Sequence, residues 1–138
     1  MLETKEKFTN SLLDILQLDI ISSLKQFLEG EVGLLFLLYR KKKSLSPKEI
    51  ALEQNISKGR VAVLINNLLD KEYIEVYIST TDRRSFDVSL SKSGEAFLMQ
   101  KMNYVDKYFT KMIKKIGEEK TETLTNLLVQ IVTSMKEE

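Results

Sequence analysis

The sequence of 138 residues contains no cysteine and no histidine. Without cysteine the chain has no disulfide, no thiolate nucleophile and no thiol redox switch. Without histidine it lacks the commonest metal ligand and the commonest general base. No nucleophile–base pair, phosphate-binding loop or acid dyad emerges from the other residues, so we do not expect an enzyme. We also expect no cofactor and no metal site, because the spacing of Asp and Glu suggests no carboxylate cluster.

Long apolar runs are missing as well. The longest extends over residues 32–39, far short of the roughly 20 residues that a membrane span needs. The N-terminus opens no signal-peptide pattern. A content of 43% hydrophobic and 30% charged residues is ordinary for a soluble globular chain. We therefore expect one cytoplasmic domain over residues 1–138.

The net positive charge of the chain is small, but basic residues are in excess in its middle. The net charge is +1, yet residues 40–92 hold 11 basic and 7 acidic residues. A positively charged surface that binds an anionic polymer such as nucleic acid would lie in this segment. A solvated surface could give the same count, so charge alone leaves the choice open.

Apolar residues at three- and four-residue spacing predict several amphipathic helices. We expect one helix over residues 8–28. Gly30 and Gly33 then interrupt the helical pattern, and a second helix follows that ends in the basic run 40–43. That run suits a helix C-terminus and could also contact phosphate. A long helix should begin after a cap at Ser91 and end at Gly117, and a last helix should cover about residues 118–135.

Two further helix starts lie between these segments. Ser46, Pro47 and Glu49 have the spacing of a capping box with proline at the first helical position, which predicts a short helix over residues 47–54. Asn55 suits a left-handed turn, and Ser57 can cap a third helix through about residue 71. Segments 73–78 and 86–90 are rich in β-branched and aromatic residues and predict a β-hairpin. The order predicts a mainly α fold with a small β-hairpin wing, the winged helix-turn-helix.

The helix after Ser57 carries candidate base contacts on the face opposite its buried apolar line. Arg60 can pair with guanine, Asn66 or Asn67 with adenine, and Val63 can meet a thymine methyl group. Ser46 and Lys48 are candidates for contacts with the sugar–phosphate backbone of the nucleic acid. Ordinary surface polarity is the alternative for the two Asn, and a winged helix used only for protein contacts is the alternative for the whole unit. The candidate residues on this helix are Ser57, Lys58, Gly59, Arg60, Val63, Asn66 and Asn67.

The segment from Thr81 to Gly94 carries a family resemblance. Asp82, Arg83 and Arg84 are followed by an apolar strand that ends in Leu-Ser shortly before Gly94. This pattern resembles the wing of the MarR family of bacterial transcriptional regulators. The resemblance implies sequence-specific DNA binding, with Arg84 in the minor groove, Asp82 ordering the loop and Arg83 at a phosphate. A narrow minor groove attracts an inserted guanidinium. A solvated loop with a local Asp–Arg pair is the alternative.

The resemblance also implies a homodimer on a pseudo-palindromic site. Residues 1–30 and 92–138 would form the dimerisation helices, and residues 31–91 the DNA-binding unit, with half-sites roughly 34 Å apart. The apolar stripes of the terminal helices support this, although burial within a monomer could also explain them. The resemblance further implies control by an effector. Because thiol sensing and histidine-based zinc sensing are excluded, either a small organic effector or no ligand at all remains. The candidate dimer residues are Leu12, Ile15, Leu16, Phe109, Met112, Ile116, Leu124, Leu128 and Ile131.

Three positions depart from the family pattern. The family usually has Gly where Glu72 stands, and a basic residue where Val76 stands and often near Val63. A non-glycine residue in a left-handed helix cap costs on the order of 1 kcal/mol, so we expect the helix to end differently here. Fewer cations should flatten the salt dependence of DNA binding and shift contacts toward Lys48, Lys58 and the wing.

Overall fold

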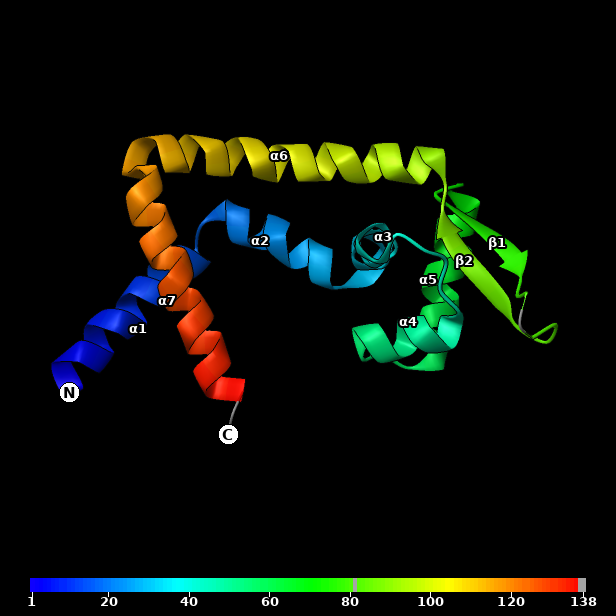
Figure 1. The fold of residues 1–138 in the computed structure, drawn as a ribbon, viewed down its shortest axis with the longest axis horizontal. Helices are drawn as coiled ribbons and strands as arrows, with labels where there is room; N and C mark the ends of the chain where they lie inside the picture. The colour runs from blue at the N-terminus through cyan, green and yellow to red at the C-terminus, as the bar shows by residue number, and fades with distance from the viewer. Residues whose placement is uncertain (81, 137–138) are drawn as a thin grey trace. The chain divides into compact units, whose positions relative to one another are not determined.

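The computed structural model describes residues 1–80 and 82–136, so that Thr81 of the wing motif lies outside the described residues. The chain divides into two compact units, Met1–Met102 and Asn103–Glu138. The second unit contains the end of α6 (Lys92–Ile116) and α7 (Glu118–Lys136). The first unit contains the start of α6 and the elements α1 (Leu2–Leu16), α2 (Asp19–Lys25), η1 (Gln26–Leu28), α3 (Gly30–Lys41), α4 (Pro47–Gln54), α5 (Lys58–Asp70), β1 (Ile74–Ile78) and β2 (Phe86–Leu90) (Figure 1).

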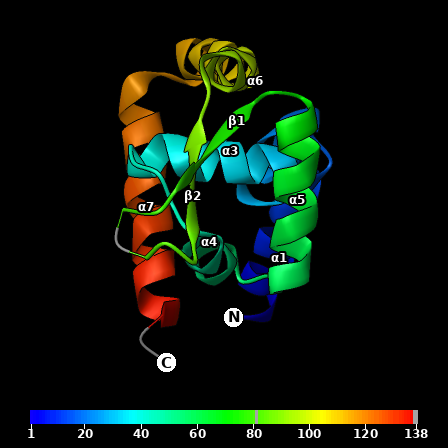
Figure 2. The ribbon, with the colours of Figure 1, turned by 90° about the vertical axis from the view of Figure 1, so that its right-hand side faces the viewer.

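A helical frame with one antiparallel hairpin confirms the predicted fold class. Strands β1 and β2 pair from Ile74 opposite Leu90 to Ile78 opposite Phe86. Leu45 pairs with the other edge of β2, because its amide and carbonyl exchange hydrogen bonds of 2.9 and 2.8 Å with the backbone of Val88. Figure 2 shows α3 behind the hairpin, α5 to one side of it and α4 below it. The hairpin is thereby attached to the segment that leads into α4.

The hydrophobic core of the first unit joins the helix-turn-helix to the hairpin. Its buried side chains come from α3, α4, α5, both strands, the start of α6 and Leu45 in the segment between α3 and α4. Burial of this many aliphatic side chains supplies the main driving force for folding and fixes how α5 is presented. The core residues are Leu34, Leu35, Leu37, Leu38, Leu45, Ile50, Val61, Leu64, Ile65, Leu68, Ile74, Val88 and Leu98.

The prediction of one helix over residues 8–28 is wrong. Helix α1 ends at Leu16, and Leu18 takes an extended backbone (φ −73°, ψ 138°) before α2 begins. The restart places Asp19 in a first turn, where a carboxylate interacts favourably with the helix dipole, and it buries Ile20. Neither Gly nor Pro marks the break, so the sequence holds no local signal for it.

The predicted interruption at Gly33 is also wrong, whereas Gly30 does mark a helix start. Gly30 has a φ of 67° and is the first residue of α3, and Gly33 lies within that helix. A Cβ on Gly33 would lie 3.0 Å from the carbonyl carbon of Leu28 and 3.1 Å from Nε2 of Gln54. Gly33 therefore allows close packing against Leu28 and Gln54 and does not break the helix.

The second unit follows the predicted pattern of two helices separated at Gly117. Gly117 has a φ of 103°, a conformation that favours glycine, and its carbonyl accepts a hydrogen bond from Oγ1 of Thr121 (2.8 Å). In the described part of α7 no residue is buried within the chain. Across residues 1–80 and 82–136, no helix is long and apolar enough to cross a membrane.

Candidate nucleic-acid interface

Helix α5 begins at a side-chain cap, as predicted. Oγ of Ser57 accepts a hydrogen bond from the amide of Arg60 (3.1 Å), which satisfies one of the unpaired N–H groups of the first turn. The remaining amides and the positive end of the helix dipole make this end of the helix favourable for an anion such as phosphate. Lys58 adds a positive charge to the same turn.

The two faces of α5 are sharply different. One face enters the core through Val61, Leu64, Ile65 and Leu68. Val63 on the opposite face is 47% exposed, which is costly for an aliphatic side chain without a partner. The structure places all the candidate residues of this helix on exposed positions, namely Ser57, Lys58, Gly59, Arg60, Val63, Asn66 and Asn67.

Helix α4 begins at the predicted capping box. The amide of Glu49 donates to Oγ of Ser46 (3.2 Å), and the amide of Ser46 donates to Oε1 of Glu49 (3.3 Å). Asn55 ends the helix in the left-handed conformation (φ 53°). Lys48 is exposed in the first turn, whereas the Ser46 hydroxyl is already an acceptor in the cap.

The expectation that α5 ends without a left-handed residue is wrong. Glu72 has a φ of 62°, and its amide donates to the carbonyl of Leu69 (2.9 Å) while the amide of Tyr73 donates to that of Leu68 (3.0 Å). These two bonds form a Schellman motif, with Glu72 at the position that usually carries glycine. The bonds retain the conformation in spite of the steric cost of a Cβ.

The start of α6 is fastened to this helix end. The hydroxyls of Ser91 and Ser93 each donate to the Glu72 carbonyl (2.7 Å), and the Ser91 hydroxyl also accepts from the Gly94 amide (3.0 Å), which is the predicted cap. A Cβ on Gly94 would overlap the carbonyl of Tyr73, so only glycine permits this approach. The sequence pointed to Gly94 only as part of a motif, and the contact explains it.

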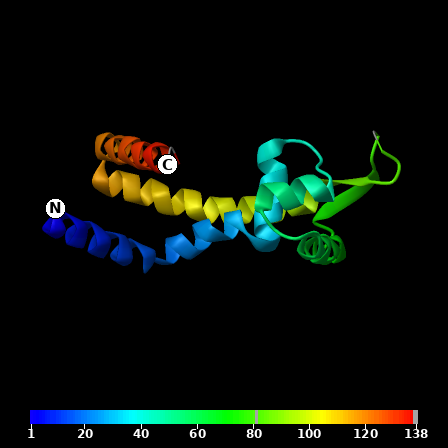
Figure 3. The ribbon, with the colours of Figure 1, turned by 90° about the horizontal axis from the view of Figure 1, so that it is seen from below.

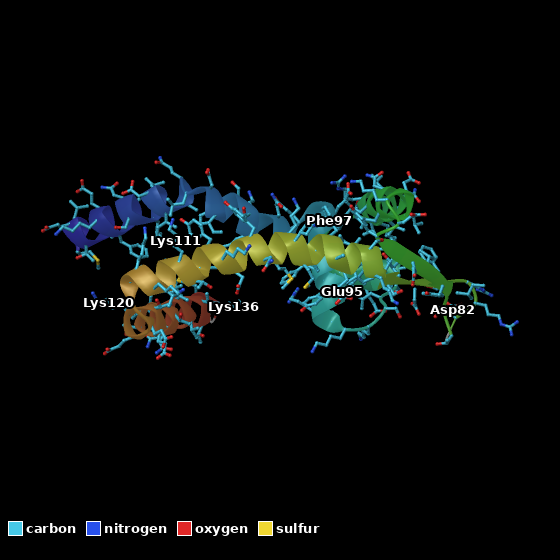
Figure 4. The ribbon with its side chains drawn as sticks, turned by 90° about the horizontal axis from the view of Figure 1, so that it is seen from above. Asp82, Glu95, Phe97, Lys111, Lys120 and Lys136 are labelled. Carbon is cyan, nitrogen blue, oxygen red and sulfur yellow. The ribbon has the colours of Figure 1, made fainter. Side chains whose placement is uncertain are left out.

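The wing turn is ordered by Asp82, which lies at the tip of the hairpin (Figure 4). Oδ1 of Asp82 accepts a hydrogen bond from the amide of Arg84 (2.9 Å), and its carbonyl accepts one from the amide of Ser85 (3.0 Å). Asp82, Arg83 and Arg84 are all exposed. The carboxylate thus holds the turn through the backbone and leaves both guanidinium groups pointing to solvent.

The cations at these positions carry no ion pair among the described residues. The pairs present involve other lysines: Lys7 with Glu3 (3.0 Å), Lys41 with Glu53 (3.1 Å) and Lys71 with Glu31 (2.7 Å). Lys48, Lys58, Arg60, Arg83 and Arg84 are therefore available to an external anion. In the basic run, Arg40 and Lys41 occupy the last turn of α3 and Lys42 is its left-handed cap, which fits the helix C-terminus prediction.

Two ionisable groups beside the helix-turn-helix are tied to acidic neighbours. The hydrogen bond and then the charge of Glu31 raise the pKa of Lys71, so this pair links α3 to the end of α5 as a neutral unit. In β1, the Tyr77 hydroxyl donates to Oε2 of Glu75 (2.6 Å), and this bond raises the pKa of Tyr77. Both shifts preserve the ordinary charge states near neutral pH.

The candidate dimer residues are largely uncovered within the chain. In α1, Leu12, Ile15 and Leu16 are 44%, 48% and 61% exposed. In the second unit, Phe109 and Met112 are half-buried. Exposure is about half for the remaining members of the set, Ile116, Leu124, Leu128 and Ile131.

A hollow of about 410 Å³ lies beside the end of α5, with aromatic and aliphatic walls and acidic groups at its rim. Within the described ranges no group of three carboxylates could hold a metal ion. The hollow is lined by Gln26, Glu29, Glu31, Val32, Leu68, Lys71, Tyr73 and Phe97.

Comparison with known proteins gives the same architecture. The model of the MarR family matches residues 28–85. The crystal structure of YusO from Bacillus subtilis is similar at 21% identity, with 96% of this chain and 94% of that chain covered and a TM-score of 0.71. That of MepR, a transcription regulator of the Staphylococcus aureus multidrug efflux pump MepA, is similar at 19% identity, with 94% and 97% covered and a TM-score of 0.68.

One similar structure contains nucleic acid. A mutant of S. aureus MepR bound to an oligodeoxyribonucleotide is 19% identical, with 95% of this chain and 97% of that chain covered and a TM-score of 0.64. Among curated protein sequences, none matches this chain. The family match spans the helix-turn-helix and the wing turn described above, and the structural likeness spans nearly the whole chain. Residues 28–85, which hold the helix-turn-helix and the wing turn, are the part of this chain that is similar to the MarR family.

Proposed function

We propose that this chain is a sequence-specific DNA-binding transcriptional regulator that acts as a homodimer on a pseudo-palindromic site. The observation that carries the proposal is the combination of a capped α5 with an exposed Arg60 and Val63, and a wing whose Arg83 and Arg84 lack ion pairs among the described residues. An N-terminal end of a helix and free guanidinium groups are suited to phosphates and base edges. MepR, which has the same fold, is a transcription regulator.

The contacts divide into two kinds by chemistry. Arg60, Val63, Asn66 and Asn67 would face base edges in the major groove, and Arg84 would enter the minor groove. Phosphate contacts would come from the other polar and cationic positions and would set affinity without specifying sequence. These are Ser46, Lys48, Ser57, Lys58 and Arg83, with Gly59 allowing close approach of the backbone and Asp82 holding the wing turn.

The dimer would cover the apolar surface of the terminal helices. Helices α1 and α7 bury no described residue within the chain, and their exposed leucines and isoleucines form stripes at helical spacing. Such surface is seldom left exposed on a monomer, which supports a self-complementary interface. Residues 1–30 and 92–138 would then contribute dimerisation, and residues 31–91 would bind DNA.

A small organic ligand would bind in the hollow beside α5. Its walls include Val32, Tyr73 and Phe97, and it adjoins the helix end that Ser91 and Ser93 fasten to α6. A ligand that shifted Tyr73 would therefore act on the orientation of α5, which supports relief of DNA binding by such a ligand.

Fluorescence anisotropy tests the proposed DNA binding. The full chain is titrated into a duplex selected from a random pool and into a scrambled duplex, at two salt concentrations. We expect tighter binding to the selected duplex and weaker binding to both as salt increases. No binding at either salt concentration would refute the proposal and favour a winged helix that contacts only proteins.

A further inference from the structure

The apolar face of the hairpin continues beyond the core. Alternate residues of the two strands share a face, and the register places Ile74 opposite Leu90, Val76 opposite Val88 and Ile78 opposite Phe86. Ile74 and Val88 are buried at the base. Toward the tip the same face becomes accessible, with Ile78 74% and Phe86 38% exposed.

The other face of the hairpin is polar, as expected for a face in water. It pairs Glu75 with Ser89 and Tyr77 with Asp87. In a strand with one buried face the apolar residues normally point to the core. Here the Ile78–Phe86 pair lies on the apolar face of the hairpin but is exposed. Figure 3 shows the hairpin projecting beyond α3, α4 and α5.

This pair lies directly below a cationic tip. The amide of Ser79 donates to the carbonyl of Ser85 (3.1 Å), which closes the hairpin one residue beyond the pair. The turn above it carries Arg83 and Arg84, whose guanidinium groups have no ion pair within the described residues. A partner that contacts both the arginines and the apolar pair must carry negative charge close to apolar surface. The edge of a DNA minor groove does so, because its phosphates lie next to deoxyribose rings.

We propose that Ile78 and Phe86 pack against deoxyribose rings at the edge of the minor groove while Arg84 enters it. The inference rests on the proposed function. It adds an apolar contact to the sugar, which, unlike a contact to phosphate, releases no counterion from the DNA. Val76 stands where the MarR pattern usually has a cation, and the pattern often has another cation near Val63, so apolar contacts would replace part of the electrostatic attraction. Affinity from such contacts is independent of salt, whereas each neutralised phosphate contributes about 0.9 to the slope of log K against log salt.

The test compares Ile78→Thr, Phe86→Thr and the double variant with the wild-type chain on one selected duplex over a series of salt concentrations. Threonine keeps a high strand propensity and adds no charge. We expect the double variant to bind about tenfold more weakly at every salt concentration with an unchanged slope. Arg84→Ala should lower both the affinity and the slope.

Tyr77→Thr is the matched control, because Tyr77 is 54% exposed on the polar face of the same strand. It should bind within about twofold of wild type, and urea denaturation should find all variants folded. Equal affinity of the double variant and wild type would overturn the inference while leaving DNA binding intact. A changed slope of log K against log salt for the double variant would also overturn the inference. So would a loss of self-association in sedimentation with unaltered DNA binding, because the pair would then serve another role. Failure of wild type to bind any duplex would instead refute the proposed function.

Discussion

Arg84 is the residue on which the proposed minor-groove contact depends. Its backbone is fixed by Asp82, and its side chain is exposed without an ion pair among the described residues. Arg84→Ala should weaken binding to a selected duplex by at least about 1 kcal/mol, because a guanidinium in a narrow groove would be lost. Arg84→Lys keeps the charge and should recover only part of the loss. Unchanged affinity of Arg84→Ala in anisotropy titrations would exclude the insertion.

Glu72 offers a test of backbone strain at the end of α5. With a φ of 62° it occupies a position where glycine is favoured. Glu72→Gly should raise the free energy of unfolding by about 0.5–1 kcal/mol, after the greater flexibility of glycine in the unfolded chain is subtracted. Glu72→Ala retains the strain and is the control. If urea denaturation found both variants equally stable, the left-handed conformation of residue 72 would not be a source of strain.

At the scale of elements, the N-terminus of α5 combines a structural cap with a proposed phosphate contact, and two substitutions separate them. Ser57→Ala removes the cap and should lower the free energy of unfolding by about 1 kcal/mol. Ser57→Asp keeps a capping oxygen, so its stability should be near wild type, but its negative charge should weaken DNA binding. If Ser57→Asp bound DNA as tightly as wild type, this end of the helix would not face phosphate.

The elements themselves were predictable where local chemistry decides them. The capping box at Ser46 and Glu49, the caps at Ser57 and Ser91 and the turn at Asn55 each form bonds within a few residues, and all are present. The break before Asp19 accompanies the burial of Ile20, and the carbonyl of the left-handed Glu72 accepts hydrogen bonds from Ser91 and Ser93, far along the chain. No local pattern records such long-range packing and bonding. The exposed Ile78–Phe86 pair was missed for a related reason: alternation predicts which face is apolar but not where the core ends.

At the scale of the whole molecule, the proposed dimer rests on the apolar stripe of α7. Leu128→Glu would place a charge in the middle of that stripe, where burial of an unpaired carboxylate is costly. We expect sedimentation to find a shift from dimer to monomer and a loss of binding to a two-half-site duplex of at least about tenfold. Asn126→Glu adds the same charge on the other side of the helix and should leave the dimer intact. A Leu128→Glu protein that remained dimeric would place the interface elsewhere.

The role of the whole chain is tested most directly by selection of bound duplexes from a random pool with the full-length protein, followed by sequencing. Two copies of α5 related by two-fold symmetry should enrich an inverted repeat whose half-sites lie about 10 base pairs apart. Arg84→Ala should enrich the same half-sites with less preference at the flanking minor groove. Recovery of a pool no different from the input, at low salt as well as at physiological salt, would contradict sequence-specific DNA binding by this winged helix.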